Sequence, residues 1–315
     1  MSHALLLPLA LLTAVGRAGP NLPALAIVAG AVLPELGALG VVLLIPAVAL
    51  LLFSTVALAE AGPLEPGEAA AVLGLAVVNL LLTPVMVHVL ATPLGFGAAS
   101  GWLVLMAGCP AAGGAVLLAA VLGLPVRQVV LSQLLCFALL PLTAPLLAAL
   151  LLDAELMDPG ALLARVALLV GLPALAALAA RRVIGRRRHA AACAPLQSCG
   201  LVALTVIGLA AGHGLPALLV EPALLAVAVP GVLFVSAAGA ALGMLAALGL
   251  SARLVAGFAL GGGIRNVSTI WGATLGLAPP EGSAILQLAS VWVVAAPALI
   301  AGVLRMRAGV RRAAV

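Results

Sequence analysis

The chain has 315 residues, of which 65% are hydrophobic and 7% are charged, and its net charge of +5 arises from 14 arginines without a lysine. A soluble domain cannot bury that much apolar surface, because about a quarter of an ordinary soluble chain is charged. The composition therefore excludes a soluble enzyme or a nucleic-acid-binding domain. It predicts an all-α polytopic membrane protein in contact with lipid.

Apolar runs recur at the length that a helix needs to cross about 30 Å of hydrocarbon. Dividing the chain at proline, glycine and charge clusters predicts ten spans. The predicted spans lie at 21–36, 40–59, 68–90, 97–122, 127–151, 159–180, 196–214, 222–248, 252–277 and 283–305. Residues 1–20 lack the basic start of a signal peptide, so we expect an interfacial segment or an extension of the first span.

Arginine predicts the orientation. The connection RRVIGRRRH after the sixth span and the tail after the tenth are basic, and Arg127 and Arg253 lie in further connections on the same side. Basic loops remain in the cytoplasm. We therefore predict a protein of the cell's inner (plasma) membrane with both termini, including the tail 307–315, on the cytoplasmic side. The acidic loop EAGPLEPGE falls on that side too, but acidic residues carry little weight in this rule.

Two spans are interrupted at matched positions. GCPAAGG (108–114) breaks span four and GGGIRN (261–266) breaks span nine, each the fourth of five spans in its half. Five spans are an odd number, so the halves 21–151 and 152–306 would have opposite orientations. Broken helices at matched positions in inverted repeats point to the midplane site of a secondary transporter. The alternative is that the glycines only let helices approach closely.

The backbone at these breaks is itself part of the predicted site. Broken backbone at membrane depth needs protein or a cavity to satisfy its freed N–H and C=O groups. The predicted crossing is formed by Gly108, Pro110, Gly113, Gly114, Gly261, Gly262 and Gly263.

Arg265 is the ionisable residue predicted near the bilayer centre, where a charge costs about 2.5–3.5 kcal/mol on insertion scales. It stays charged, and no Asp or Glu lies in the interior of a predicted span to pair with it, since Glu35 and Glu68 stand at span ends. One alternative is that it binds a substrate carboxylate in a bidentate geometry, aided by half-helix N-termini. The other is that it caps the carbonyls of a half-helix and touches no substrate.

Three amides complete the predicted substrate-binding set with Arg265. Asn266 either caps a broken-helix end or contacts substrate, Asn79 bonds either the crossing or a neighbouring helix, and Gln133 is expected near the same place. An intramembrane enzyme would need a nucleophile with a base, or metal ligands, at this depth. We therefore predict no catalytic residue, no resident metal and no cofactor.

Five motifs resemble the bile acid:sodium symporter family in order and spacing, over nearly the whole chain. The matching segments are VVNLLLTPVMVHVL, LVLMAGCPAAGGAVLLAAV, LPLTAP, GGGIRNVSTIWGATLGLA and SVWVVAAPALIAGVL. The resemblance implies ten helices arranged as two inverted five-helix repeats, divided into a panel domain and a core domain. It also implies that helices four and nine cross as broken helices in the core.

The sequence departs from this family where the relatives bind two sodium ions. The family's ligand positions fall on Ala115, Val116, Gln133, Gly261, Arg265, Val293 and Val294, while Asn79 and Asn266 remain. We therefore do not expect sodium coupling by the family's mechanism, although backbone carbonyls at the breaks could bind sodium weakly. The Arg265 guanidinium would stand where sodium stands in the relatives, as a built-in cation.

The predicted function is secondary transport of a small organic anion, bile-acid-like or another carboxylate, by alternating access at the crossing. Its coupling stays open among facilitated diffusion, proton linkage and sodium symport. One alternative is a non-transporting receptor or assembly protein that retains the symporter fold. Others are an auxin-efflux-like carrier and an arsenite-type exporter.

Overall fold

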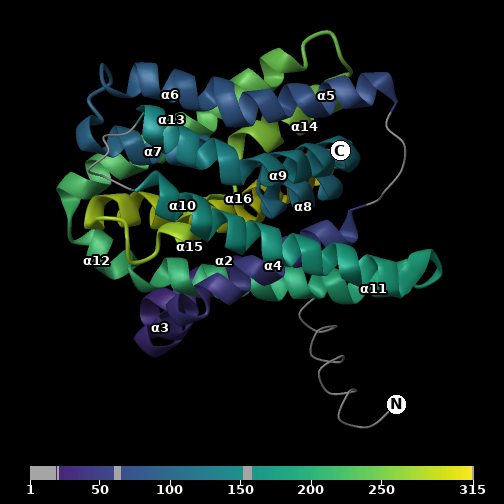
Figure 1. The fold of residues 1–315 in the computed structure, drawn as a ribbon, viewed down its shortest axis with the longest axis horizontal. Coiled ribbons are helices and arrows are strands. Elements are labelled where there is room, and N and C mark those ends of the chain that lie inside the picture. Colours follow the sequence, from purple (N-terminus) through teal and green to yellow (C-terminus); the bar gives the residue numbers. More distant parts are fainter. Residues whose placement is uncertain (1–18, 20, 60–64, 152–157, 314–315) are drawn as a thin grey trace.

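The computed structural model describes residues 19, 21–59, 65–151 and 158–313, which are 86% helical and include no strand (Figure 1). Six helices are long and apolar enough to cross a membrane, or up to seven if one bent pair counts as a span. The predicted all-α polytopic membrane class fits this content. Nearly all of segment 1–20, and residues 314–315 of the tail, lie outside the described residues.

The first half of the chain is built mostly from short helical segments and ends with the 26-residue α9. They are α2 (Asn21–Val32), α3 (Pro34–Val42), α4 (Leu44–Leu58), α5 (Pro66–Val77), η1 (Val78–Leu82), α6 (Thr83–Ala91), η2 (Gly97–Ala99), α7 (Ser100–Ala107), α8 (Gly113–Val121) and α9 (Val126–Leu151).

The second half contains the longest helices. They are α10 (Pro159–Val166), η3 (Ala167–Gly171), α11 (Leu172–His213), α12 (Leu215–Leu219), α13 (Pro222–Ala246), α14 (Ala252–Gly263), α15 (Val267–Thr274) and α16 (Pro280–Ala313). The six long spans found among the described residues coincide with the third, fifth, sixth, seventh, eighth and tenth predicted spans.

The first two predicted spans differ from the structure. α2 ends at Val32, and α3 is bent from it by 116°. Pro34 explains the bend, because it cannot donate a backbone hydrogen bond and disfavours helical geometry at the residue before it. Leu33 is indeed extended, with φ −114° and ψ 89°. The boundaries predicted at 36 and 40 are therefore wrong, and ten full-length spans are not confirmed.

Proline also explains two π-helical turns inside long helices. η1 precedes Pro84 and η3 precedes Pro173. A proline ring collides with the carbonyl four residues earlier and leaves that carbonyl without its partner. Widening the turn relieves the collision. In η1 this widening frees backbone carbonyls beside Asn79, which matter for the site described below.

Both halves of α11 pack against α4. Ala177 and Leu196, which lie in different halves, belong to one apolar cluster with Val56 and Ala57. The chain therefore doubles back within this element, at the right-hand end of the view in Figure 1. Its second half also packs against α2, where an added Cβ on Gly208 or Gly212 would strike backbone carbonyls of α2.

A second pair of glycines lets α13 and α14 touch. A Cβ added at Gly239 would fall on the Gly262 carbonyl, and one at Gly243 would fall on the Phe258 carbonyl. Small residues at four-residue spacing allow backbones to approach this closely in membranes. Gly262 thus permits close helix approach, which is the alternative interpretation given above for the glycine-rich segments.

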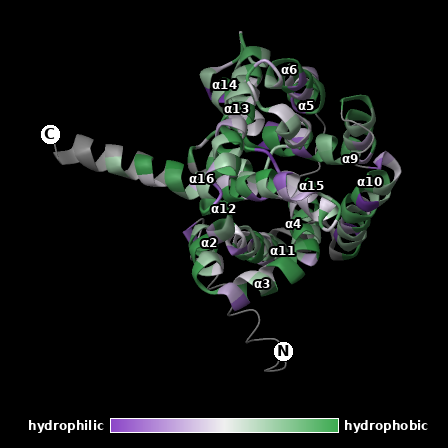
Figure 2. Ribbon diagram, turned by 90° about the vertical axis from the view of Figure 1, so that its left-hand side faces the viewer, coloured by the Kyte–Doolittle hydropathy of each residue, from purple (hydrophilic) through white to green (hydrophobic). Residues whose placement is uncertain are grey.

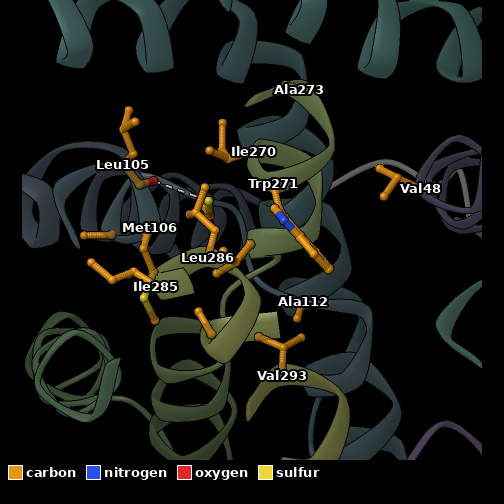
Figure 3. Packing of buried hydrophobic residues seen from close by; sticks show 14 of the residues in the cluster. Val48, Leu105, Met106, Ala112, Ile270, Trp271, Ala273, Ile285, Leu286 and Val293 are labelled. Carbon is orange, nitrogen blue, oxygen red and sulfur yellow. Dashed lines mark hydrogen bonds between the residues drawn. The ribbon is translucent and has the colours of Figure 1, made fainter. Parts of the chain in front are cut away.

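The helices form two groups (Figure 2). The α11 group consists of α2, α3, α4 and α11, together with α10–η3, which continues into α11. The α16 group consists of α5 to α9 with α13 to α16, and α10 packs against its members α9 and α15. The main apolar cluster runs through both groups: Figure 3 shows Val48 of α4 in the same cluster as Leu105 of α7, Trp271 of α15 and Leu286 of α16. This cluster surrounds the two interrupted helices.

Candidate functional site

The two predicted breaks meet. α7 ends at Ala107 and α8 begins at Gly113, while α14 ends at Gly263 and α15 begins at Val267. The segments between them form an antiparallel β-bridge that pairs Ala111 with Arg265. In it, the Ala112 N–H donates to the Ile264 carbonyl at 2.8 Å and the Asn266 N–H donates to the Pro110 carbonyl at 2.7 Å.

This bridge supplies hydrogen-bond partners to backbone groups that the two breaks expose. Each break exposes N–H and C=O groups that water cannot reach at membrane depth. Pro110 brings no N–H, so its break needs fewer acceptors than another sequence would. The breaks supply partners to each other, and the prediction that both spans are interrupted and lie together is confirmed in these contacts.

Arg265 is fully buried at the centre of the bridge, with 0% of its surface exposed. Its guanidinium donates to one hydroxyl and four backbone carbonyls drawn from three parts of the chain. Nε bonds Gly262 O at 2.6 Å, Nη1 bonds Ala107 O at 2.8 Å, Asn79 O at 3.1 Å and Cys109 O at 3.2 Å, and Nη2 bonds Thr83 Oγ1 at 2.8 Å.

The positive charge has no carboxylate partner among the described residues. An ion pair does join Arg127 to Glu68 at 3.2 Å, but it lies near one end of the helices and does not involve Arg265. Around Arg265, carbonyl dipoles at the end of α7, at the end of α14 and in η1 do the stabilising instead. The site therefore carries a net charge of +1 that only dipoles balance.

These contacts favour the capping alternative for Arg265. All three of its nitrogen atoms donate to protein oxygens, including carbonyls at the C-terminal ends of two half-helices. Direct contact with a substrate carboxylate stays a prediction.

Asn79 bonds the crossing, which is one of the two alternatives that its sequence position leaves open. Its Nδ2 donates to the Gly261 carbonyl at 3.3 Å, and its own carbonyl accepts from Arg265. The π-helical turn of η1 accounts for the free carbonyl. Within the described residues, its Oδ1 has no hydrogen-bond partner.

Asn266, in the second break, and Gln133, on a neighbouring helix, are buried with unmet hydrogen-bonding capacity. The Asn266 Oδ1 accepts from the Ser268 hydroxyl at 2.7 Å, but its Nδ2 finds no partner in the described part of the chain. Neither polar atom of the Gln133 side chain finds one there either. Gln133 lies on α9, which packs against η1 and α14. A buried unpaired polar group costs about 1–3 kcal/mol, so each amide calls for water or a solute.

The seven backbone positions predicted at the crossing divide between two tasks. Gly108, Pro110 and Gly113 lie in or beside the first break, and the Gly261 and Gly262 carbonyls accept from Asn79 and Arg265. Gly114 and Gly263 mainly permit close packing, Gly114 against Pro297 of α16 and Gly263 against Ser236 and Ala240 of α13.

Thr83 is the site residue that sequence reasoning missed. Its hydroxyl donates to the Val78 carbonyl at 2.8 Å and accepts from the Arg265 guanidinium. A signal was available, because Thr83 follows Asn79 by four residues and so shares its helix face, directly before Pro84.

We expect Thr83→Val to lower the unfolding free energy by about 1–3 kcal/mol, because it leaves a buried guanidinium N–H unpaired and removes one of the two donors to the Val78 carbonyl. Thermal melting of the purified protein in detergent measures this. Thr143→Val is the matched control, because the Thr143 hydroxyl has no partner among the described residues and its loss should cost nothing. Equal melting temperatures for the two variants would contradict the role given to Thr83.

No protein-family model matches the chain, and no curated protein matches it either. The resemblance to the symporter family accordingly stays a hypothesis based on the five motifs.

Proposed function

We propose that this chain is a secondary transporter that moves a small organic anion by alternating access around the paired helix breaks. In this proposal it is a divergent relative of the bile acid:sodium symporters, with inverted repeats at 21–151 and 152–306. The α11 group would be the panel domain and the α16 group the core. The observation that carries the proposal is the bridge between two helices interrupted at matched positions about 150 residues apart.

An anion fits the electrostatics of the crossing. The uncompensated charge of Arg265 raises the local potential, and low-dielectric surroundings strengthen its attraction for a negative group. The unpaired Asn266 Nδ2 and Gln133 Nε2 are hydrogen-bond donors of the kind that a carboxylate accepts. An anion can therefore be held by charge and amides while Arg265 keeps its bonds to protein.

The same contacts argue against sodium coupling. A hard cation needs several oxygen ligands, and five oxygens at this crossing already bond the guanidinium. A covalently attached cation cannot dissociate during a transport cycle, so it cannot carry the energy of an ion gradient. Facilitated diffusion, or linkage to protons, follows as the mode of transport.

Uptake of labelled organic anions into proteoliposomes tests both points. We expect the same rate with sodium or with choline outside, and exchange of external label for unlabelled anion preloaded inside. Liposomes without protein are the control. Uptake in sodium alone would overturn the built-in cation and demand a sodium site built from backbone carbonyls, Asn79, Gln133 and Asn266.

The second candidate is a non-transporting receptor or assembly protein that retains the fold. The engagement of Arg265 by protein favours it, because all three guanidinium nitrogens already donate to protein oxygens and need no solute. Absence of flux for every anion of a broad panel, in a protein that melts cooperatively, would select this candidate.

A further inference from the structure

Side-chain hydrogen bonds join the two helix groups in two places. Arg165 of α10 donates through Nη1 to the Leu275 carbonyl at 2.9 Å and to the Ala273 carbonyl at 3.4 Å, at the end of α15. Gln287 of α16 donates through Nε2 to the Ala211 carbonyl of α11 at 2.8 Å.

Both contacts lie at the same end of the molecule. Ala211 precedes the end of α11 by two residues, and Leu275 follows α15 directly. α16 begins at Pro280, shortly before Gln287, and α10 begins at Pro159, shortly before Arg165. The Arg165 and Gln287 contacts therefore both lie near the helix ends at one end of the molecule.

Hydrogen bonds described at the opposite end stay within one group. Arg181 donates to the Val56 carbonyl at 3.4 Å, inside the α11 group. Gln128 and Arg127 bond Glu68, inside the α16 group. These contacts hold each group together and place no bond across the boundary.

A hollow lies on the boundary between the groups, away from the Arg165 and Gln287 contacts. Its cavity volume is about 10 Å³, about the space of one water molecule, and apolar residues line it. Its walls are Pro23, Leu201 and Leu204 of the α11 group and Gly114, Val293, Val294 and Pro297 of the α16 group. Leu201 precedes Ala211, and Pro297 follows Gln287, by ten residues, so the hollow lies about 15 Å along both helices.

We propose that Arg165 and Gln287 form a gate that closes one end of the boundary between the helix groups. The inference rests on the proposed function, because alternating access requires each end to close in turn. In the structure the gate is shut. Opening separates Arg165 from the α15 carbonyls and Gln287 from Ala211.

The exposed contacts of Arg165 suit a gate that opens, and the buried contacts of Arg265 suit a crossing that stays intact. Arg165 is exposed, so water can replace its bonds and breaking them costs little. Arg265 is fully buried and bonds its own group alone, so its contacts persist while the groups move. The negative carbonyl end of α15 draws Arg165 back when the gate closes.

Thiol labelling of the full-length protein tests the gate. Ser290 follows Gln287 by about one helical turn on the face that leads to Val294, and it is 1% exposed. We would place Ser290→Cys in a background in which the four native cysteines are replaced by alanine. Reconstituted protein is then treated with a membrane-impermeant maleimide on either side.

With the gate intact we expect slow labelling of Ser290→Cys. Arg165→Gln combined with Gln287→Leu should raise the rate about ten-fold from the gate side, since the charged donor and the amide that make the three hydrogen bonds are both removed. Arg165→Lys keeps a donor and should remain slow. Gln128→Leu is the matched control, because it removes the same kind of side chain from a contact within one group.

An unchanged rate in variants that melt cooperatively would overturn the gate, and so would an equal rise in Gln128→Leu. Arg165→Gln alone alters an exposed side chain and keeps the test available if the double variant fails to fold. Labelling needs no solute, so its outcome is independent of uptake. Anion flux with unchanged labelling rejects the gate alone, whereas faster labelling without flux rejects transport but retains the motion.

Discussion

Replacement of Arg265 by alanine is expected to lower the unfolding free energy by several kcal/mol, because a buried polar group left without its partner costs about 1–3 kcal/mol. Four carbonyls and the Thr83 hydroxyl lose their donor in a place that water does not reach. The two helix breaks would then be joined only by the bridge, so the loss should fall on the whole α16 group.

Thermal melting in detergent, with and without millimolar guanidinium ion, measures this effect. The free ion can occupy the space of the lost side chain, so we expect it to raise the melting temperature of Arg265→Ala but not of the parent. Arg265→Lys should fall between the two, because an ammonium has three donors and no planar fork. Arg253→Ala removes an exposed arginine from the start of α14 and is the matched control.

Two outcomes would decide against a structural role. Melting of Arg265→Ala at the parent temperature would mean that the carbonyls have other partners. Loss of anion uptake without loss of stability would select the alternative in which Arg265 binds the substrate directly.

Gly239→Ala is expected to destabilise the protein by about 3 kcal/mol, because the new Cβ overpacks a tight contact. It would fall on the Gly262 carbonyl and within 2.5 Å of the Arg265 Nη2. Both neighbours are fixed, one as backbone and the other by its hydrogen bond to Thr83. α13 and α14 must therefore separate.

The same melting experiment measures this second effect. Gly74→Ala is the control: a Cβ there meets nothing within 4 Å, and replacing a helical glycine should stabilise α5 by about 0.5–1 kcal/mol. Equal melting for the two variants would show that α13 and α14 can shift without cost.

The breaks could be read from the sequence because their signals are local. Glycine, proline and a charge inside an apolar run oppose a continuous helix whatever surrounds them. The bend at Pro34 and the π-helical turn before Pro84 have local causes as well. A prediction based mainly on span length passes over both, since neither changes the hydropathy of the run.

The partners of Arg265 could not be read in this way. That it needs oxygen acceptors follows from its charge, but the choice of the Asn79, Ala107 and Cys109 carbonyls depends on how η1 and α7 pack. Those acceptors are backbone atoms that any residue type would supply. Only Thr83 contributes a side chain, and its contact with Arg265 can be predicted only when the position of η1 beside the crossing is known.

The contacts of Arg265 also set an order for biogenesis. The carbonyls of Ala107 and Cys109 enter the bilayer more than 150 residues before the arginine that satisfies them is synthesised. Until then the first interrupted helix has neither its bridge partner nor its cation. The amino-terminal half is thus inserted in an incomplete form, and the nascent chain reaches its stable topology only when the second interrupted helix has left the ribosome.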